Sequence, residues 1–232
     1  MGEPSFSPAL FAFLEELARN NDRAWFKANR QRYEDAAQEP ALAFISGFAP
    51  RLRTISPHLA ADARPVGGSL HRIQRDLRFS RDKSPYRTNI AVRFPHERSR
   101  GVQAPTSYPS YYLHLAPGEV FAGAGVWHPD SATLGRIRDA IVARPGEWRA
   151  AAHGGAFAAR FRLTGESLVR PPRGYDPAHP LIEDLKRKDF VASAPLSEAA
   201  VTSPGFVEEL AGLCQLAAPF MRFLCEALDL PF

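Results

Sequence analysis

The chain has 232 residues, 45% of them hydrophobic and 11% aromatic, as expected for a globular protein with a buried core. No apolar run reaches the roughly 18 residues that a membrane-spanning helix needs. The N-terminus lacks a basic region and turns acidic at Glu15 and Glu16, so we expect neither a membrane protein nor a signal peptide. The net charge is +4, but residues 72–100 hold nine Lys and Arg against three Asp and Glu. The basicity is therefore local.

The two cysteines, Cys214 and Cys225, both fall in a predicted C-terminal helix. Their spacing along such a helix is about 16 Å, too far for a disulfide. We expect two core thiols and a cytoplasmic protein. Metal-ligand spacings of Cys and His are absent, as are the HExxH, GxSxG, Walker and GxGxxG patterns, so we expect no metal and no cofactor.

Helices are predicted at the N-terminal end. Ser7-Pro8 is a helix start, followed by an apolar stripe from Leu10 to Leu17. Asp22 can cap a second helix, and a helical period continues from Leu42 to Ile55.

Strands are predicted after Gly67-Gly68. In residues 72–79 apolar and charged side chains alternate with a period of two, and the same holds for residues 87–94. With "SRDKSPY" as the connecting loop, the two segments predict a hairpin with one apolar and one Arg-rich face.

A second hairpin is predicted in "SYYLHLAPGEVFAGAGVW", with the turn at residues 116–119. A helix capped by Asp130 or Ser131, a proline-rich loop, a short helix at 181–188, a strand in "DFVASAPL" and a final helix after Ser203-Pro204 follow. The sequence thus predicts one α+β domain over residues 1–232. Its central, mainly antiparallel sheet of two hairpins is packed by N- and C-terminal helices.

The Arg-rich face of the first hairpin admits two interpretations. Arg72 and Arg78 would share a face with Asp76 between them, and Arg87, Asn89 and Arg93 would lie on the same side of the neighbouring strand. Like charges side by side on a sheet repel, so an anionic ligand or carboxylates from elsewhere must offset them. Arg offers planar paired donors suited to phosphate or carboxylate. The alternative is a solvated face with internal Arg–Asp pairs.

Other residues near this hairpin have open roles. By alternation Arg75 points toward the core, where a buried guanidinium needs a partner, so it is either a structural or a site residue. The connecting loop is either a binding loop or a plain connector. The candidate acid or base residues are Asp76, Asp82 and His114.

Four segments occur in the order "NNDRAWFKANRQRYE", "GGSLHRIQRDLRFSRDKSPYRTNI", "YYLHLAPGE" with "GVW", and "RPPRGYDPAHPLIEDLKRKDF". In these the chain resembles the domain of unknown function 2461 family, over nearly its whole length. The resemblance implies one α+β domain with no assigned activity and no catalytic residues to carry over. The signature residues here are Asn21, Arg23, Trp25, Phe26, Asn29, Arg30, Tyr33, Arg72, Arg75, Asp76, Arg78, Phe79, Ser80, Asp82, Lys83, Pro85, Tyr86 and Asn89. His71 and Gln74 stand where the family pattern leads us to expect an aromatic residue.

The predicted helix that holds the signature residues from 21 to 33 is here called the signature helix. We expect it and the Arg-rich hairpin to converge on a pocket for a phosphorylated or carboxylated small molecule, in a protein that could be an enzyme. The alternatives are a nucleic-acid or nucleoprotein binding module and a module for an acidic protein partner. The expected ligand-binding residues are Arg72, Arg75, Arg78, Lys83, Tyr86, Arg87, Asn89, Asn29 and Arg30. Residue patterns leave the ligand, the reaction class and the oligomeric state open.

Overall fold

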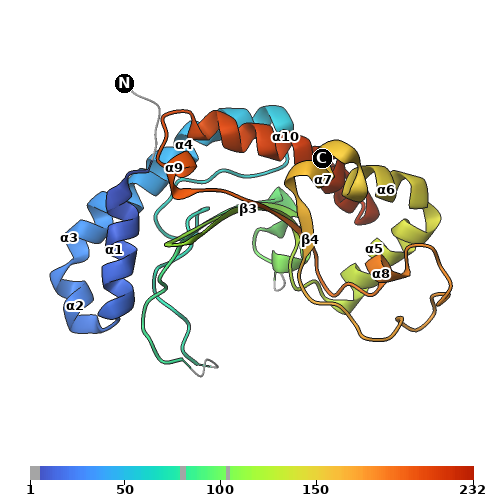
Figure 1. The fold of residues 1–232 in the computed structure, drawn as a ribbon, viewed down its shortest axis with the longest axis horizontal. Coiled ribbons are helices and arrows are strands. Elements are labelled where there is room, and N and C mark those ends of the chain that lie inside the picture. Colours follow the sequence, from blue (N-terminus) through green and yellow to red (C-terminus); the bar gives the residue numbers. More distant parts are fainter. Residues whose placement is uncertain (1–5, 79–81, 103–104) are drawn as a thin grey trace.

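Helices cover one face of a curved five-stranded sheet and leave the other face open (Figure 1). The computed structural model describes residues 6–78, 82–102 and 105–232. The sheet is antiparallel throughout, with the strand order β1-β2-β3-β5-β4. The strands are β1 (Ile90–Pro95), β2 (Ser110–Ala116), β3 (Glu119–Val126), β4 (Arg162–Thr164) and β5 (Phe190–Pro195). The predicted α+β fold is confirmed.

Alternation along the strands divides the sheet into a buried and an open face. On β2, Tyr111, Leu113 and Leu115 are buried, while the side chains between them are half-buried. The second predicted hairpin and the predicted strand at 189–196 are therefore both confirmed. β4 was not predicted, because three residues are too few to show a period.

The buried face packs against two long helices, α4 (Glu39–Ile55) and α10 (Phe206–Ala227), which cross the top of the molecule in Figure 1. The hydrophobic side chains between the helices and the sheet form a continuous core. Its aromatic members include Phe44 and Phe206, whose rings stack 5.3 Å apart. Both cysteines lie in α10 as buried free thiols. None of the described helices is both long enough and apolar enough to cross a membrane.

Two helical lobes lie at the two ends of the layer formed by the sheet, α4 and α10, one on either side of the open face (Figure 1). The N-terminal lobe consists of α1 (Pro8–Arg19), α2 (Arg23–Ala28), α3 (Arg30–Tyr33) and the π-helix η1 (Glu34–Gln38). The C-terminal lobe contains α5 (Ser131–Ala143), α6 (Pro145–His153), α7 (Gly155–Arg160) and α8 (Ile182–Leu185). The short elements η2 (Glu97–Ser99), η3 (Pro105–Ser107) and α9 (Glu198–Val201) complete the chain.

The predicted helix caps are in place. The Asp22 carboxylate accepts hydrogen bonds from the backbone N–H groups of Ala24 and Trp25, and Asp130 accepts one from Thr133. Pro8 is the first residue of α1, as predicted.

The prediction that residues 72–79 form a regular strand is wrong for its described part, 72–78. Residues 69–78 and 82–89, here called the basic ribbon, are held by isolated bridges between Leu70 and Val92 and between Gln74 and Tyr86. Gln74 follows Leu70 by four positions, whereas Val92 follows Tyr86 by six. The second side of the ribbon therefore contains two extra residues. Such a bulge re-aims the side chains beside it. The predicted regular ladder between the two segments is therefore absent in the described residues. Phe79 and Ser80 lie outside the described residues.

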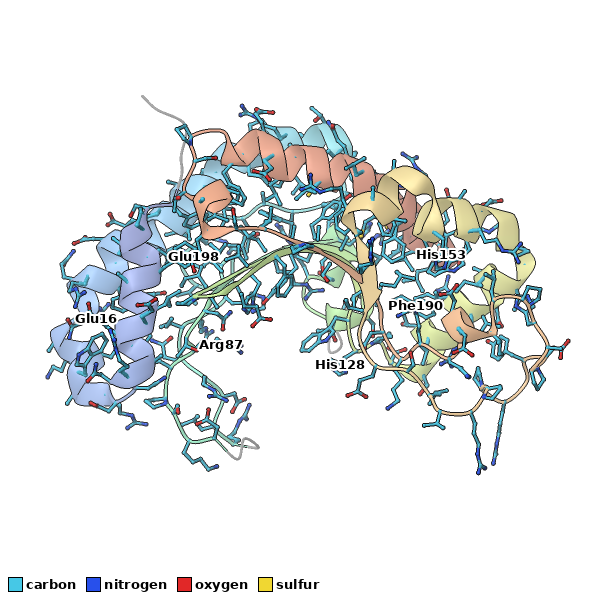
Figure 2. All side chains as sticks on the ribbon, viewed as in Figure 1. Glu16, Arg87, His128, His153, Phe190 and Glu198 are labelled. Atoms are coloured by element: carbon cyan, nitrogen blue, oxygen red, sulfur yellow. The ribbon has the colours of Figure 1, made fainter. Side chains whose placement is uncertain are left out.

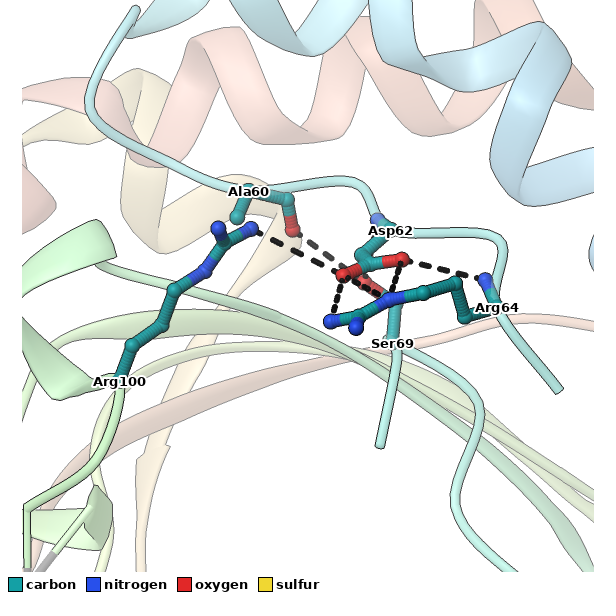
Figure 3. A network of polar contacts seen from close by, with 5 residues as sticks. All are labelled: Ala60, Asp62, Arg64, Ser69 and Arg100. Atoms are coloured by element: carbon teal, nitrogen blue, oxygen red, sulfur yellow. Dashed lines mark hydrogen bonds and ion pairs between the residues drawn. The ribbon is translucent and has the colours of Figure 1, made fainter. Parts of the chain in front are cut away.

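The base of the basic ribbon is fixed by a polar network (Figure 3). The Asp62 carboxylate accepts hydrogen bonds from the Arg64 guanidinium, and Arg100 lies 3.8 Å away as a second cation. The Ser69 hydroxyl accepts from the Asp62 N–H and donates to the Ala60 carbonyl. The guanidinium of Arg64 lowers the pKa of Asp62, so the carboxylate stays charged. The ribbon thus leaves the sheet at a defined position.

Candidate functional site

The open side of the sheet is the inner side of its curve and lies between the two lobes (Figure 1). It carries the half-buried side chains that alternate with the core residues of β1, β2, β3 and β5. Here we call it the concave face, defined by Arg93, Tyr112, His114, Phe121, Gly123 and Ser193. Figure 2 shows Arg87 and His128 on opposite sides of the space below it.

Cationic side chains gather at the β1 side of the concave face. The half-buried Arg93 guanidinium donates hydrogen bonds from Nε to Ser110 Oγ (3.1 Å) and from Nη2 to the Tyr108 carbonyl (3.4 Å). Burial lowers the pKa of Arg93 from its usual value, although an arginine stays charged at neutral pH. The exposed Arg87 lies close enough for its charge to act on both His71 and Tyr112.

His71 reports the sign of the local field. The crowded surroundings of its imidazole, followed by the positive charges of Arg87 and Arg93, lower the pKa of His71 to about 4. This holds although much of its side chain reaches solvent. Burial, the largest cause, disfavours a charge of either sign here, while the smaller contribution from Arg87 and Arg93 favours an anion over a cation.

Aromatic rings occupy the middle of the concave face. The His114 and Phe121 rings, directly opposite each other on β2 and β3, stack with centroids 4.8 Å apart and an angle of 10°. Tyr112 lies 6.0 Å from Phe121 and 6.2 Å from His71. The rings therefore form a connected row beside the cations.

His114 is the predicted acid or base candidate that lies at this surface. Its Nδ1 is 3.4 Å from the Tyr112 hydroxyl and 3.5 Å from the Asn89 amide nitrogen, both of which can donate to a neutral ring. Burial lowers the pKa of His114, while Glu119, 4.0 Å from Nε2, acts in the opposite direction. A neutral imidazole with an oriented Nδ1 can accept or relay a proton.

Other predicted site residues are brought together at the tip of the basic ribbon. Asp76 pairs with Arg78, Asp82 pairs with Arg75, and Lys83 Nζ donates to the Leu77 carbonyl. Hydrogen bonds from Arg78 lower the pKa of Asp76 to about 2, and hydrogen bonds from Ser84, then Arg75, lower that of Asp82 to about 2. Such acidic carboxyls are poorly matched to proton transfer near neutral pH. Arg75 is half-exposed in its ion pair rather than inserted in the core.

The signature helix and the ribbon meet along a groove of about 530 Å³. Arg30 and Arg72 line it together with His71, which thereby connects the groove to the concave face. Tyr86 stacks on Phe26 at 4.0 Å, and Asn29 donates to the Trp25 carbonyl within its own helix. Five of the signature residues therefore line this groove, namely Phe26, Arg30, Tyr33, Arg72 and Tyr86. Of these Tyr86 makes a packing contact, and Asn29 is not among the lining residues.

Five residues of the concave face were not among the predicted site residues: Arg93, Tyr112, Phe121, Gly123 and Ser193. The alternation of "SYYLHL" and "EVFAGAG" places Tyr112, Phe121 and Gly123 on common strand faces, and that of β1 and β5 does the same for Arg93 and Ser193. What the pattern does not reveal is that one of the two faces stays uncovered. Within the described residues no group of three His, Cys, Asp or Glu side chains could hold a metal ion.

The fold and the site together define an α+β protein whose antiparallel sheet presents a cationic and aromatic concave face between two helical lobes. A family model described as conserved hypothetical protein (DUF2461) matches residues 9–223, so the chain belongs to this family, as its motifs predicted. The comparisons with curated proteins and with solved structures found no match.

Proposed function

We propose that the protein binds an anionic small molecule, phosphorylated or carboxylated, on the concave face. The observation that carries the proposal is the position of Arg93 directly opposite Tyr112 on the uncovered face of the sheet, with the His71 ring 6.2 Å from the Tyr112 ring. The charge of Arg87 acts on both of these rings. Arg93 is held by Ser110 Oγ and the Tyr108 carbonyl, so its guanidinium is already oriented before a ligand arrives. Preorganised, partly desolvated guanidinium groups are strong donors to phosphate and carboxylate.

Neutral groups add selectivity to this surface. The Asn89 amide has two N–H donors, so one remains for a ligand oxygen when the other points to His114. His114, oriented by Tyr112, is the candidate acid or base if a reaction occurs. Asp76 and Asp82 are less suited to that role, because each is paired at the ribbon tip. The two free buried thiols are compatible with a reducing compartment, so the cytoplasm is part of the proposal.

A binding survey by isothermal titration tests the proposal. Inorganic phosphate, sugar phosphates, nucleotides, dicarboxylates and a short oligonucleotide are titrated at low and moderate salt. Arg87→Ala removes one cation of the site. Arg53→Ala removes an exposed cation from α4, on the covered side of the sheet, and is the matched control.

We expect at least one small-molecule class to bind, with the affinity reduced about tenfold or more in Arg87→Ala and unchanged in Arg53→Ala. Binding of the oligonucleotide alone, with an affinity that falls steeply with salt, would favour the nucleic-acid alternative. If no anion binds, or if both variants weaken binding equally, the proposal is wrong.

A further inference from the structure

Cationic, aromatic and glycine residues of the concave face lie on successive strands. One row of directly paired residues runs from Arg93 on β1 through Tyr112 on β2 and Gly123 on β3 to Ser193 on β5. Cations therefore lie at one end, an aromatic ring follows, and bare backbone comes next. Since neighbouring strands are about 4.8 Å apart, Arg93 and Gly123 are separated by roughly 10 Å across the sheet.

Gly123 lies at the middle of this row without a backbone reason to be glycine. A Cβ atom built there would lie 3.4 Å from the Tyr112 Cβ, an ordinary van der Waals contact. Gly125 differs, because its φ is +130° and a Cβ would lie 2.0 Å from the Phe190 carbonyl oxygen. Gly125 is thus required by the fold. Gly123 instead leaves a patch of sheet backbone uncovered, where a flat group can approach closely.

Aromatic rings border this uncovered patch. Tyr112 is its cross-strand neighbour, and Phe121 precedes it by two residues on the same face of β3. Phe121 is half-buried and stacks on His114 rather than entering the core. Half-exposed rings of this kind provide faces and edges for stacking with a planar ligand.

We propose that the ligand of the concave face is an aromatic anion, with its ring over Gly123 beside Tyr112 and Phe121 and its charged group at Arg87 and Arg93. Nucleotides and aryl phosphates have this chemistry, as does a nucleotide unit within a single strand. The inference rests on the proposed function, because it names the class of anion that the same site accepts.

The test compares aromatic with non-aromatic anions of the same charge type. Phenyl phosphate and adenosine and uridine 5′-monophosphates are titrated against ribose 5-phosphate by isothermal titration, with a short single-stranded oligonucleotide in a further arm. Gly123→Val fills the space above the backbone and keeps the cations. Phe121→Leu keeps an apolar side chain without a ring, and serves if Gly123→Val does not fold. Arg87→Ala removes a cation and keeps the ring site.

We expect the aromatic phosphates to bind at least about tenfold tighter than ribose 5-phosphate. Gly123→Val or Phe121→Leu should abolish that advantage and leave the ribose 5-phosphate affinity unchanged, whereas Arg87→Ala should weaken every phosphate. An oligonucleotide that binds more tightly than the mononucleotides and loses affinity in Gly123→Val would support ring recognition. It would also identify a nucleotide unit of nucleic acid, and not a free nucleotide, as the aromatic anion.

The contrary outcomes are separable. Equal affinities for phenyl phosphate and ribose 5-phosphate, both dependent on Arg87, would overturn the aromatic-anion inference and leave the proposed function standing. An absence of binding by every anion would overturn both.

Discussion

Asn21 joins the N-terminal lobe to the basic ribbon. Its side-chain amide donates to the Tyr86 carbonyl and its side-chain oxygen accepts from the Tyr86 N–H, both at 3.0 Å. One side chain thus satisfies both backbone groups of a residue 65 positions away. The signature asparagine therefore orients the ribbon, and with it Arg87.

We predict that Asn21→Ala lowers the free energy of unfolding by about 1–3 kcal/mol, because the Tyr86 backbone groups are part-buried and lose both partners. Asn20→Ala is the control, since Asn20 is exposed and its side chain donates only to the Glu16 carbonyl of its own helix. That variant should change stability by less than about 0.5 kcal/mol. Urea unfolding compares the two, and equal losses would contradict the orienting role of Asn21.

The depressed pKa of His71 gives a prediction about pH. Above the unfolded-state value of about 6.5 the ring is neutral in both states, and its contribution to stability is fully present. As the pH falls toward the folded-state value of about 4, the unfolded chain binds the proton first and that contribution is lost. We therefore expect the stability of His71→Asn to decline less steeply than that of the wild type between pH 6.5 and 4.

The cause of that shift is testable by NMR titration of the histidines. Arg87→Ala should raise the pKa of His71, because one of the two neighbouring positive charges is removed. His96 is the internal control, since burial is the main cause of its lowered pKa and Arg87 is not among the charges that act on it. A His71 pKa that does not change would show that Arg87 lies too far away to share a binding site with it.

At the scale of elements, a period of two in the sequence does not determine a regular strand. The alternation in residues 72–78 is real, with Ile73 buried and its neighbours exposed, yet only isolated bridges form. The two extra residues between Tyr86 and Val92 break the register, and a residue count on one strand cannot reveal which partner it will meet. The second hairpin was predictable because its short turn fixes the register.

The two glycines of β3 predict opposite responses to the same substitution. Gly125→Ala should lower the free energy of unfolding by at least about 1–3 kcal/mol, because a positive φ and a clash with the Phe190 carbonyl both oppose the new methyl group. Gly123→Ala should be tolerated, because its Cβ meets only an ordinary contact with Tyr112. Thermal unfolding of both variants is the measurement. A large loss in Gly123→Ala would mean that Gly123 is structural.

At the scale of the whole molecule, composition and alternation predicted the fold class but not the curved shape. Pattern shows which faces of β2 and β3 are apolar, while the coverage of each face depends on where α4 and α10 finally pack. The sequence therefore led to Arg87, Asn89 and His114 as expected site residues and placed Arg93 on the Arg-rich face. It did not point to Phe121, which belongs to the concave face because α4 and α10 pack on the other side of the sheet.

We predict that both lobes unfold together, because one continuous core connects them. Trp25 reports on the N-terminal lobe and the buried Trp148 on the C-terminal lobe. In variants whose single tryptophan is either Trp25 or Trp148, with Trp127 also replaced, the fluorescence midpoint in urea should coincide with the far-UV circular dichroism midpoint of the same variant. Separate midpoints would show that the lobes are independent units.

The two thiols in α10 have a practical consequence. Burial raises the pKa of Cys225 to about 12 and raises that of Cys214 further, so neither is a reactive thiolate in the folded protein. A single cysteine introduced on the surface of each lobe would then be the preferred target of a maleimide dye, with the native cysteines left in place. A pair of such dyes makes the separation of the two lobes measurable by energy transfer, one molecule at a time and with each candidate ligand.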